Sequence, residues 1–436
     1  MGILLFLSYF AGSFGYLLIL YHGGSLATGS YSVSLQSANL LLNPPFALSL
    51  PIIFYLLVLI YEKNYSLKTT IHFILGVIAI VAFKFYGIVV AGVFSLIFFY
   101  EMVKSKQIPW KQIILRLLFF FCLFFLMVIF VYNPFRSPTS EPLFKFSPFA
   151  MVHATIEERD LLYLPNIVNA RYYLYAQGVW GPRLLAIELF STAIFILLHF
   201  GARILGLVYI CFQFFRRKTT SHNYYIFFTI VATTLATILF IQRGEWWNTV
   251  QFSYYGIALS NIFLAIVVFK IMQKKTLLRY ILAGSIIVLL LPQNYQIFTT
   301  FTTRNSIYID DKELEALAYL DKQPYGVVFT AFQDVEKQYR FLPYKLTGYV
   351  SAFTDKPIFY GHEAQMSITG IDYRERKARV ESLDCTIFDE VDYIYFVKTL
   401  KRDFLDACQP QVGTFSRIYE NDLVEIYSKF SSDAGD

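Results

Sequence analysis

Charged residues are scarce in this 436-residue chain, where Asp, Glu, Lys and Arg make up 16%. Soluble domains carry about 25%. Hydrophobic residues make up 56%, and Phe and Tyr alone number 45 and 33. This composition excludes an ordinary soluble globular protein, because one aqueous core does not need so much apolar and aromatic surface. The sequence therefore predicts a polytopic membrane protein with membrane lipids around it.

Motifs for nucleotides and metals are also lacking. The chain holds no G-x-x-x-x-G-K-[ST], no G-x-G-x-x-G and no C-x-x-C, and its six histidines are scattered. No cofactor is indicated with certainty, and a divalent metal stays an open alternative. The positive net charge does not indicate nucleic acid, because residues 1–303 hold 21 Lys and Arg against 8 Asp and Glu, whereas residues 304–436 hold 16 against 23. Two bodies in two environments explain this split.

Nine apolar runs of spanning or nearly spanning length predict an α-helical membrane bundle over residues 1–300. They fall at about 3–21, 45–61, 71–83, 86–103, 113–132, 184–215, 224–241, 254–271 and 280–297. Asn43 with Pro44 and Pro45 predicts a helix start. The run 184–215 is interrupted at "HFGARI", so we expect it to lie flat on the membrane first and then to cross.

Lys and Arg in four short loops set the expected orientation in the cell membrane. These loops carry Lys63 and Lys68, then Lys104, Lys106 and Lys111, then Arg216, Arg217 and Lys218, and finally Lys274, Lys275 and Arg279. With about nine spans they all fall on the cytoplasmic side. Residues 23–44, 133–183 and 242–253 and the C-terminal part then face outward.

The C-terminal part, residues 301–430, is predicted to be an extracytoplasmic α/β domain. Short β-rich runs such as "YGVVFTAF", "KPIFYG", "DYIYFVK" and "LVEIYSK" alternate with the helical patterns "DDKELEALAYLDK" and "YRERKARVESL". We expect a partly parallel sheet that is covered on both faces. Cys385 and Cys408 lie in this domain and are a candidate disulfide, whereas Cys122 and Cys211 lie inside apolar runs.

The segment 133–183 is long, aromatic and rich in proline, and we interpret it as interfacial helices on the outer leaflet. It serves either as a plain lid or as a platform for a substrate. Glu141, Glu157 and Glu158 are expected on water-exposed loops. Other outward acids and bases lie near membrane depth, where ionisable residues tend to be functional.

Two further features have both a structural and a functional interpretation. Lys84 stands alone between apolar runs, either as a lysine that snorkels to the membrane surface or as a ligand for a lipid phosphate. The stretch "IQRGEWWNTVQFSYYG", residues 241–256, is part of an aromatic belt, but its polar residues favour the lip of a binding site.

Four stretches carry a resemblance to a known family. They are "LQSANLLLNPPFALSL" (35–50), "FKFYGIVVAG" (83–92), "QRGEWWNTVQFSYYG" (242–256) and, after residue 314, "EALAYLDKQPYGVVFTAF…GYVSAFTDKPIFYGHEAQ…YRERKARV". With them the chain resembles prokaryotic multi-pass membrane proteins of the C-type glycosyltransferase superfamily, the dolichyl-phosphate-mannose mannosyltransferase-like enzymes.

The resemblance implies a glycosyltransferase-like protein that transfers a sugar from a polyprenyl-phosphate-linked donor on the outer face. Such proteins normally carry an acid in the first outward loop, and residues 23–44 hold none. They also carry several spans before the equivalent of residues 3–21, so the resemblance implies an N-terminal truncation. A non-catalytic membrane assembly or polysaccharide-binding protein, or a lipid or glycolipid transporter, stays as an alternative.

For the enzyme interpretation we expect acids, bases and aromatic side chains to converge on one outward cavity. The candidate catalytic acids are Asp160, Glu188 and Glu245. The candidate phosphate ligands are Lys84, Arg171 and Arg243. Further candidate substrate contacts are Tyr86, Trp246, Trp247, Asn248 and Gln251.

Overall fold

The fold is a helical unit joined to a small α/β unit, as seen in a computed structural model. The model describes residues 2–23, 43–133, 142–159, 161–244, 246–273, 275–295, 309–330, 348–361, 363–399 and 403–429. The helical unit, here called the membrane unit, comprises residues 1–135, 144–242 and 246–303. The C-terminal unit comprises residues 136–143, 243–245 and 304–436. The predicted boundary near residue 300 lies outside the described residues.

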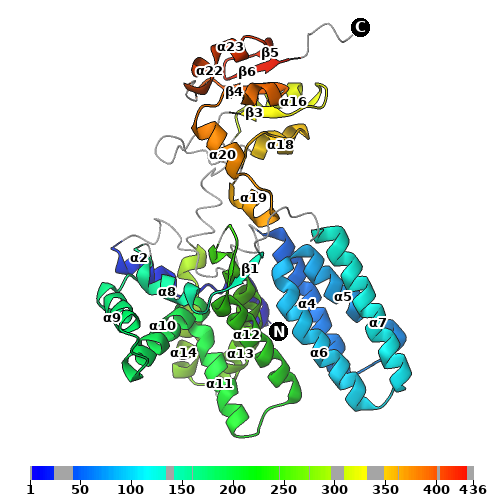
Figure 1. Cartoon of the computed structure of the whole chain (residues 1–436). Coiled ribbons are helices and arrows are strands. Elements are labelled where there is room, and N and C mark those ends of the chain that lie inside the picture. The colour runs from blue at the N-terminus through cyan, green and yellow to red at the C-terminus, as the bar shows by residue number, and fades with distance from the viewer. Residues whose placement is uncertain are drawn as a thin grey trace. The chain divides into compact units, whose positions relative to one another are not determined.

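Six helical segments among the described residues are long and apolar enough to cross a membrane. They are α4 (Pro44–Glu62), η1 with α6 (Phe85–Ser105), α7 with η2 (Trp110–Tyr132), α10 to α11 (Pro182–Phe215), α12 (Ser221–Leu239) and α13 with most of η4 (Trp247–Met272). Two shorter apolar helices are α5 (Leu67–Phe83) and α14 (Leu277–Val288). The helices α4 to α7 lie side by side (Figure 1). Asn43 caps α4 as predicted, because its side chain accepts a hydrogen bond from the Phe46 amide.

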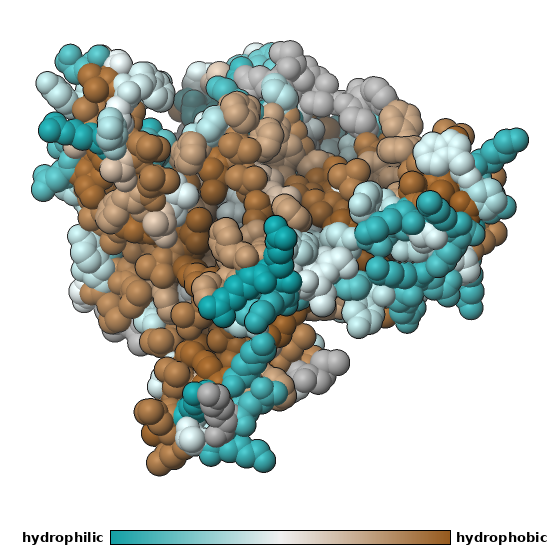
Figure 2. All heavy atoms as spheres, turned by 90° about the horizontal axis from the view of Figure 1, so that it is seen from below, coloured by the Kyte–Doolittle hydropathy of each residue, from teal (hydrophilic) through white to brown (hydrophobic). Residues whose placement is uncertain are grey.

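Large apolar side chains on the outside of the membrane unit suit a lipid environment. Figure 2 shows a face on which apolar side chains predominate and polar ones gather in patches. On α7 and η2, Leu115, Leu118, Phe121 and Phe130 are all more than half exposed. An aqueous surface rarely carries such a large apolar patch, so this exposure supports the assignment as a membrane protein.

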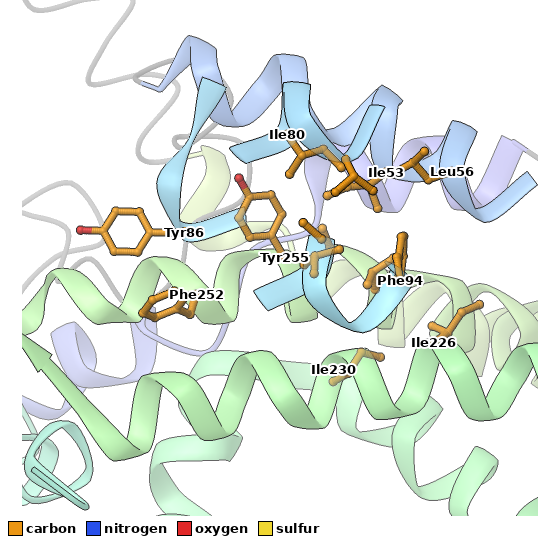
Figure 3. Close-up of a cluster of buried hydrophobic side chains, with 14 of the residues drawn as sticks. Ile53, Leu56, Ile80, Tyr86, Phe94, Ile226, Ile230, Phe252 and Tyr255 are labelled. Carbon is orange, nitrogen blue, oxygen red and sulfur yellow. The ribbon is translucent and has the colours of Figure 1, made fainter. Parts of the chain in front are cut away.

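The helix α13 (Val250–Met272) forms the centre of the membrane unit and packs against α12, α11 (Ile204–Phe215), α1 (Gly2–Phe10) and α14. Glycine allows two of these close approaches. A Cβ on Gly256 would lie 2.4 Å from the Thr233 hydroxyl of α12, and one on Gly206 would lie 2.5 Å from the Leu264 nitrogen of α13. The aromatic rings of Tyr255 and Phe252 extend from α13 into an apolar cluster (Figure 3).

The first apolar run is not one helix, which corrects the prediction of a continuous span over residues 3–21. Helix α1 ends at Phe10 and α2 (Tyr16–Tyr21) begins after a five-residue break. The break is stabilised by tertiary hydrogen bonds from the Gly12 amide to the Leu290 carbonyl (2.7 Å) and from the Phe14 amide to the Leu198 carbonyl (3.0 Å). Main-chain groups that leave a helix inside an apolar domain need such partners.

A fully buried arginine lies beside this break. Arg203 belongs to η3 (Gly201–Arg203), which separates α10 (Pro182–Phe200) from α11 at the interruption that the sequence indicated. Its guanidinium donates to the carbonyls of Ala11 (2.7 Å) and Gly12 and to the side chain of Asn261 (2.7 Å). Nearby, the Ser13 hydroxyl donates to Gln293 (2.7 Å). This polar node joins helices that are far apart in the sequence.

The segment 133–183 contains helices α8 (Ala150–Glu157) and α9 (Pro165–Ala176). It also contains a strand that the sequence did not predict. Strand β1 (Phe144–Phe146) pairs antiparallel with β2 (Phe240–Gln242), so that Phe144 lies opposite Gln242. Three residues are too short for a period-2 pattern to stand out.

The C-terminal unit contains a four-stranded sheet in the order β3-β4-β6-β5. Its strands are β3 (Val328–Thr330), β4 (Tyr393–Val397), β5 (Ser416–Glu420) and β6 (Val424–Ser428). Strands β3 and β4 are parallel and the other pairs antiparallel. Every residue of β4 is buried, which requires cover on both faces of the sheet. The predicted strand at "KPIFYG" forms only a bridge between Ile358 and Val328, and β5 was not predicted.

Helices complete the C-terminal unit. They are α16 (Asp311–Asp321), α18 (Gly348–Thr354), α19 (Glu363–Thr369), α20 (Arg374–Glu381), α21 (Ile387–Glu390), α22 (Asp403–Ala407) and α23 (Gln409–Val412). Helix α16 contacts β5 and β6, and its Ala316, Leu317 and Leu320 are buried in the core of this unit.

Cys385 and Cys408 form a disulfide that closes a sequence separation of 23 residues. Cys408 is fully buried in the core of the C-terminal unit. The cross-link removes conformations from the unfolded chain. For a loop of this length the chain-entropy relation gives about 3 kcal/mol.

Replacing both Cys385 and Cys408 with alanine should therefore lower the free energy of opening of the C-terminal unit by about 3 kcal/mol. Native-state hydrogen exchange of the buried β4 amides measures this quantity in the full chain. The matched control replaces the free cysteines Cys122 and Cys211, which should leave β4 protection unchanged. Equal β4 protection in the two double variants would contradict the expectation.

Candidate functional site

A cavity of about 1140 Å³ lies in the membrane unit between α8, α9 and α10. We call it the α8–α10 cavity. Its polar lining residues are Ser147, His153, Glu157, Glu158, Arg171, Tyr172 and Glu188. Its aromatic and apolar lining includes Phe149, Tyr175, Trp180, Leu184 and Leu185. A concave apolar site with a few convergent polar groups is the usual form of a small-ligand site.

Local sequence sets the three walls of the cavity. Pro165 and Pro182 stand at the first turns of α9 and α10, where proline is favoured because its missing N–H would have no helical partner. Helix α8 starts after Phe149, which has a left-handed backbone (φ 65°), and ends at Glu157. The two turns fold α9 back against α8 and α10, so that Arg171 meets acids from both neighbours.

Arg171 is the centre of an ion-pair network. Its Nε donates to Glu188 Oε1 (2.9 Å) and its Nη1 to Glu157 Oε1 (3.1 Å). Its Nη2 lies 2.9 Å from His153 Nδ1, and His153 Nε2 lies 2.6 Å from Glu188 Oε2. The guanidinium is therefore held by two carboxylates and one imidazole.

His153 joins the two ends of the network. Its Nδ1 faces the Arg171 guanidinium and its Nε2 faces the Glu188 carboxylate. Both ring nitrogens are thus occupied within the network, and His153 serves to orient Glu188 and Arg171.

Glu157 and Glu158 have different roles despite being neighbours. The Tyr172 hydroxyl donates to Glu157 Oε2 (3.1 Å), so both oxygens of Glu157 are engaged. Burial and the Glu157 carboxylate raise the pKa of the Tyr172 phenol above its usual range. Glu158 also lines the cavity, but its exposed carboxylate has no hydrogen bond or ion pair with any residue that the structure describes. It is thus the carboxylate that is available to a ligand.

Aromatic rings form the outer wall of the cavity. Tyr175 and Trp180 meet edge to face, with ring centroids 5.8 Å apart, and Trp180 is 79% exposed. Phe149 lies against His153 with ring centroids 6.1 Å apart. Such faces stack on sugars and attract cations, because the π face carries partial negative charge.

A second polar feature lies at the junction of α5 and η1. Lys84 is half-buried, and its Nζ lies 5.4 Å from the centre of the Tyr86 ring. The Tyr86 hydroxyl donates to Gln242 on β2. Figure 3 shows the Tyr86 ring beside Phe252 with its hydroxyl pointing away from the apolar cluster. No acid among the described residues pairs with Lys84. We call Lys84, Tyr86 and Gln242 the Lys84 corner.

Strand β1 connects the corner with the cavity. Phe144 stacks on Phe85 with ring centroids 5.5 Å apart, and it pairs with Gln242 across the ladder. Three residues later Ser147 lines the cavity. A strand rises about 3.3 Å per residue, so Phe144 and Ser147 are separated by roughly 10 Å along the chain.

The predicted site residues lie partly in the α8–α10 cavity and partly in the Lys84 corner. Glu188 and Arg171 lie together in the cavity, and Lys84 and Tyr86 lie in the corner. Asp160, Glu245 and Glu141 lie outside the described residues, and the side chain of Trp246 is not described.

The remaining candidates in the stretch 241–256 do not line the cavity. Gln251 donates to the side chain of Asn248 (2.9 Å), and Trp247 is 42% exposed. Arg243 falls in the C-terminal unit, where it donates to the Ser367 carbonyl (2.8 Å).

Sequence reasoning missed His153 and placed Glu157 and Glu158 on water-exposed loops. The structure corrects this placement for Glu157, which is the last residue of α8 and is partly buried, whereas Glu158 follows the helix and is exposed, as expected. Both acids line the cavity. The available signal was the i, i+4 spacing of His153 and Glu157, which puts them on one helix face. No group of three potential metal ligands occurs within the described ranges. Comparison with family models, curated proteins and solved structures finds no match.

Proposed function

We propose that the chain is an integral membrane transferase that moves a sugar from a polyprenyl-phosphate-linked donor to a hydroxyl group of an acceptor. The observation that carries the proposal is the Glu158 carboxylate, which has no partner among the described residues and lines a cavity whose other charges are fixed by a network. A free carboxylate beside a rigid, aromatic-lined wall is what a general base for a hydroxyl nucleophile requires.

The proposed reaction assigns one proton to Glu158. The acceptor hydroxyl oxygen forms a bond to the anomeric carbon of the sugar, and the bond between that carbon and the phosphate oxygen breaks. The lipid phosphate leaves with the electron pair, and the hydroxyl proton passes to Glu158. Arg171, Glu157, Glu188 and His153 position the wall on which the reacting groups lie, because Arg171 pairs with both acids and His153 contacts Arg171 and Glu188.

We place the donor phosphate at the Lys84 corner rather than in the cavity. Lys84 offers a cation without a described acid partner, and a phosphate is a strong acceptor for it. The apolar surfaces of the neighbouring helices suit the polyprenyl chain.

The proposed topology adds α1 with α2, α5 and α14 to the six long spans. Nine crossings then put the basic loops in the cytoplasm and the C-terminal unit outside the cell membrane. The Lys84 corner and segment 133–183 fall on the outer side together. A periplasm-active reporter fused after Asn305 should be active, and one fused after Lys218 should not.

Radiolabelled polyprenyl-phosphate sugars and a membrane acceptor fraction test the proposal. The wild-type protein in lipid nanodiscs should transfer label to the acceptor. Replacing Lys84 with alanine should raise the KM for the donor about tenfold or more, because a charge-assisted hydrogen bond contributes about 1.5–3 kcal/mol.

The matched control for this variant is Lys68→Ala, which removes an exposed lysine in the first turn of α5, at the end predicted to be cytoplasmic. Its KM should equal that of the wild type. Absence of transfer from every donor tried, or a Lys84→Ala protein with unchanged donor KM, would contradict the assignment.

A further inference from the structure

We propose that the α8–α10 cavity selects a headgroup that carries a protonated amine. This inference rests on the proposed function for the role of the site, and it names the chemical class that the site recognises. The shared chemistry is a primary ammonium group on a polar head, which an amino sugar or an aminophospholipid headgroup can supply.

Acidic side chains outnumber basic ones in the lining of the cavity. Three carboxylates, on Glu157, Glu158 and Glu188, face one guanidinium, on Arg171. His153 adds at most one positive charge to the lining. The lining therefore holds a net negative charge in either protonation state of this imidazole. Arg159 and Arg183 adjoin the lining in sequence but do not line the cavity. A cation is attracted to such a site, and an anion is repelled.

The charged groups of the lining differ in whether they can still bind a ligand. Arg171 is saturated by Glu157, Glu188 and His153, so it offers little to an incoming phosphate. Glu158 has no partner within the part of the chain that the structure describes, so it offers a full carboxylate to an ammonium. Both the net charge of the lining and its accessible carboxylate thus favour a cationic ligand.

The aromatic wall of the cavity also suits a cation. The Tyr175 and Trp180 rings meet at an interplanar angle of 63°, and both line the same cavity as Glu158. Two aromatic faces at an angle, with a carboxylate nearby, form the usual environment for alkylammonium groups. Apolar surface at Leu184 and Leu185 continues from this wall along α10, a helix of spanning length. A ligand with an ammonium head and an apolar tail therefore fits the whole cavity.

Binding of water-soluble headgroups tests the inference without any need for transfer. The full chain in nanodiscs of neutral lipid is titrated with glucosamine, N-acetylglucosamine, glucose and glucose 6-phosphate at neutral pH. The emission of Trp180 reports binding, and the Trp180→Phe protein supplies the background of the other tryptophans. Glucosamine should bind about ten- to hundredfold more tightly than N-acetylglucosamine, since only the former keeps the ammonium.

Glycerophosphoethanolamine forms a second arm that separates the two sources of the amine. Tighter binding of glucosamine assigns an amino sugar, and tighter binding of glycerophosphoethanolamine assigns a lipid headgroup. Glu158→Gln should abolish the preference for the amine while keeping weak binding of glucose, and Glu62→Gln, an exposed acid on α4, should keep the preference.

Equal binding of glucosamine and N-acetylglucosamine would overturn the inference, as would tighter binding of glucose 6-phosphate. A Glu158→Asp protein guards against a folding defect, because it keeps the charge and should keep most of the preference. A failed transfer assay with an intact amine preference would reject the proposed function alone. Transfer without an amine preference would reject this inference alone.

Discussion

Replacing Arg203 with leucine is expected to lower the free energy of unfolding of the membrane unit by about 3–5 kcal/mol. The side chain is fully buried and donates to the carbonyls of Ala11 and Gly12, where the first apolar run leaves its helix. Leucine would remove these donors while the carbonyls stay buried, and each unsatisfied buried acceptor costs about 1–3 kcal/mol. Unfolding in mixed micelles with increasing SDS, followed by circular dichroism, measures the change.

Two controls separate geometry from charge. Arg203→Lys keeps the charge but cannot reach three acceptors with a planar fork, so it should lose a large part of the same free energy. Arg216→Leu removes an exposed arginine that lies 4.0 Å from the Phe212 ring centre, and it should cost at most about 1 kcal/mol. An Arg203→Leu protein as stable as Arg216→Leu would show that the polar node is not what holds the broken helix.

Replacing Glu158 with glutamine is expected to lower kcat for sugar transfer about 10²–10⁴-fold, the range that a general base contributes. Glutamine keeps the size of the side chain and its hydrogen-bonding capacity, but it cannot accept the acceptor proton. Because the Lys84 corner is untouched, the KM for a donor whose sugar carries no amine should change little. Initial rates with a radiolabelled donor, over a range of donor concentrations, separate the two parameters.

The network provides an informative comparison for this variant. Arg171→Lys keeps a cation but loses the fork that contacts Glu188 and Glu157 together, so the wall should loosen and both kcat and KM should change. Glu62→Gln alters an acid at the far end of α4 and should leave both parameters as in the wild type. A Glu158→Gln protein with wild-type kcat would mean that another group takes the proton.

The sequence was informative where local physics decides the structure. Apolar runs predicted the long helices, and Asn43 before Pro44 predicted the start of α4, because capping depends on neighbouring residues only. The break after Phe10 could not be predicted in this way. The run "SYFAGSFGYL" is apolar throughout, and its interruption depends on partners near residues 198, 203 and 290.

At the site, too, the sequence indicated single residues but not which of them meet in space. Glu188 and Arg171 were selected because ionisable side chains near membrane depth are rare. Their meeting with His153 and Glu157 depends on how α9 folds back against α8 and α10, which no local pattern specifies. The stretch that begins at Ile241 was selected for its aromatic and polar composition. In the structure the side chain of Gln251 donates to that of Asn248, one helical turn earlier.

Chemical rescue at position 158 tests the central claim most directly. In a Glu158→Ala protein the cavity gains space where the carboxylate stood, and added formate can supply a base there. If Glu158 takes the acceptor proton, formate should raise the transfer rate of this variant at least about tenfold, without raising the rates of the wild type or Glu62→Gln. A transfer rate that formate leaves unchanged, in a protein that still binds donor like the wild type, would contradict the assignment of Glu158 as the base.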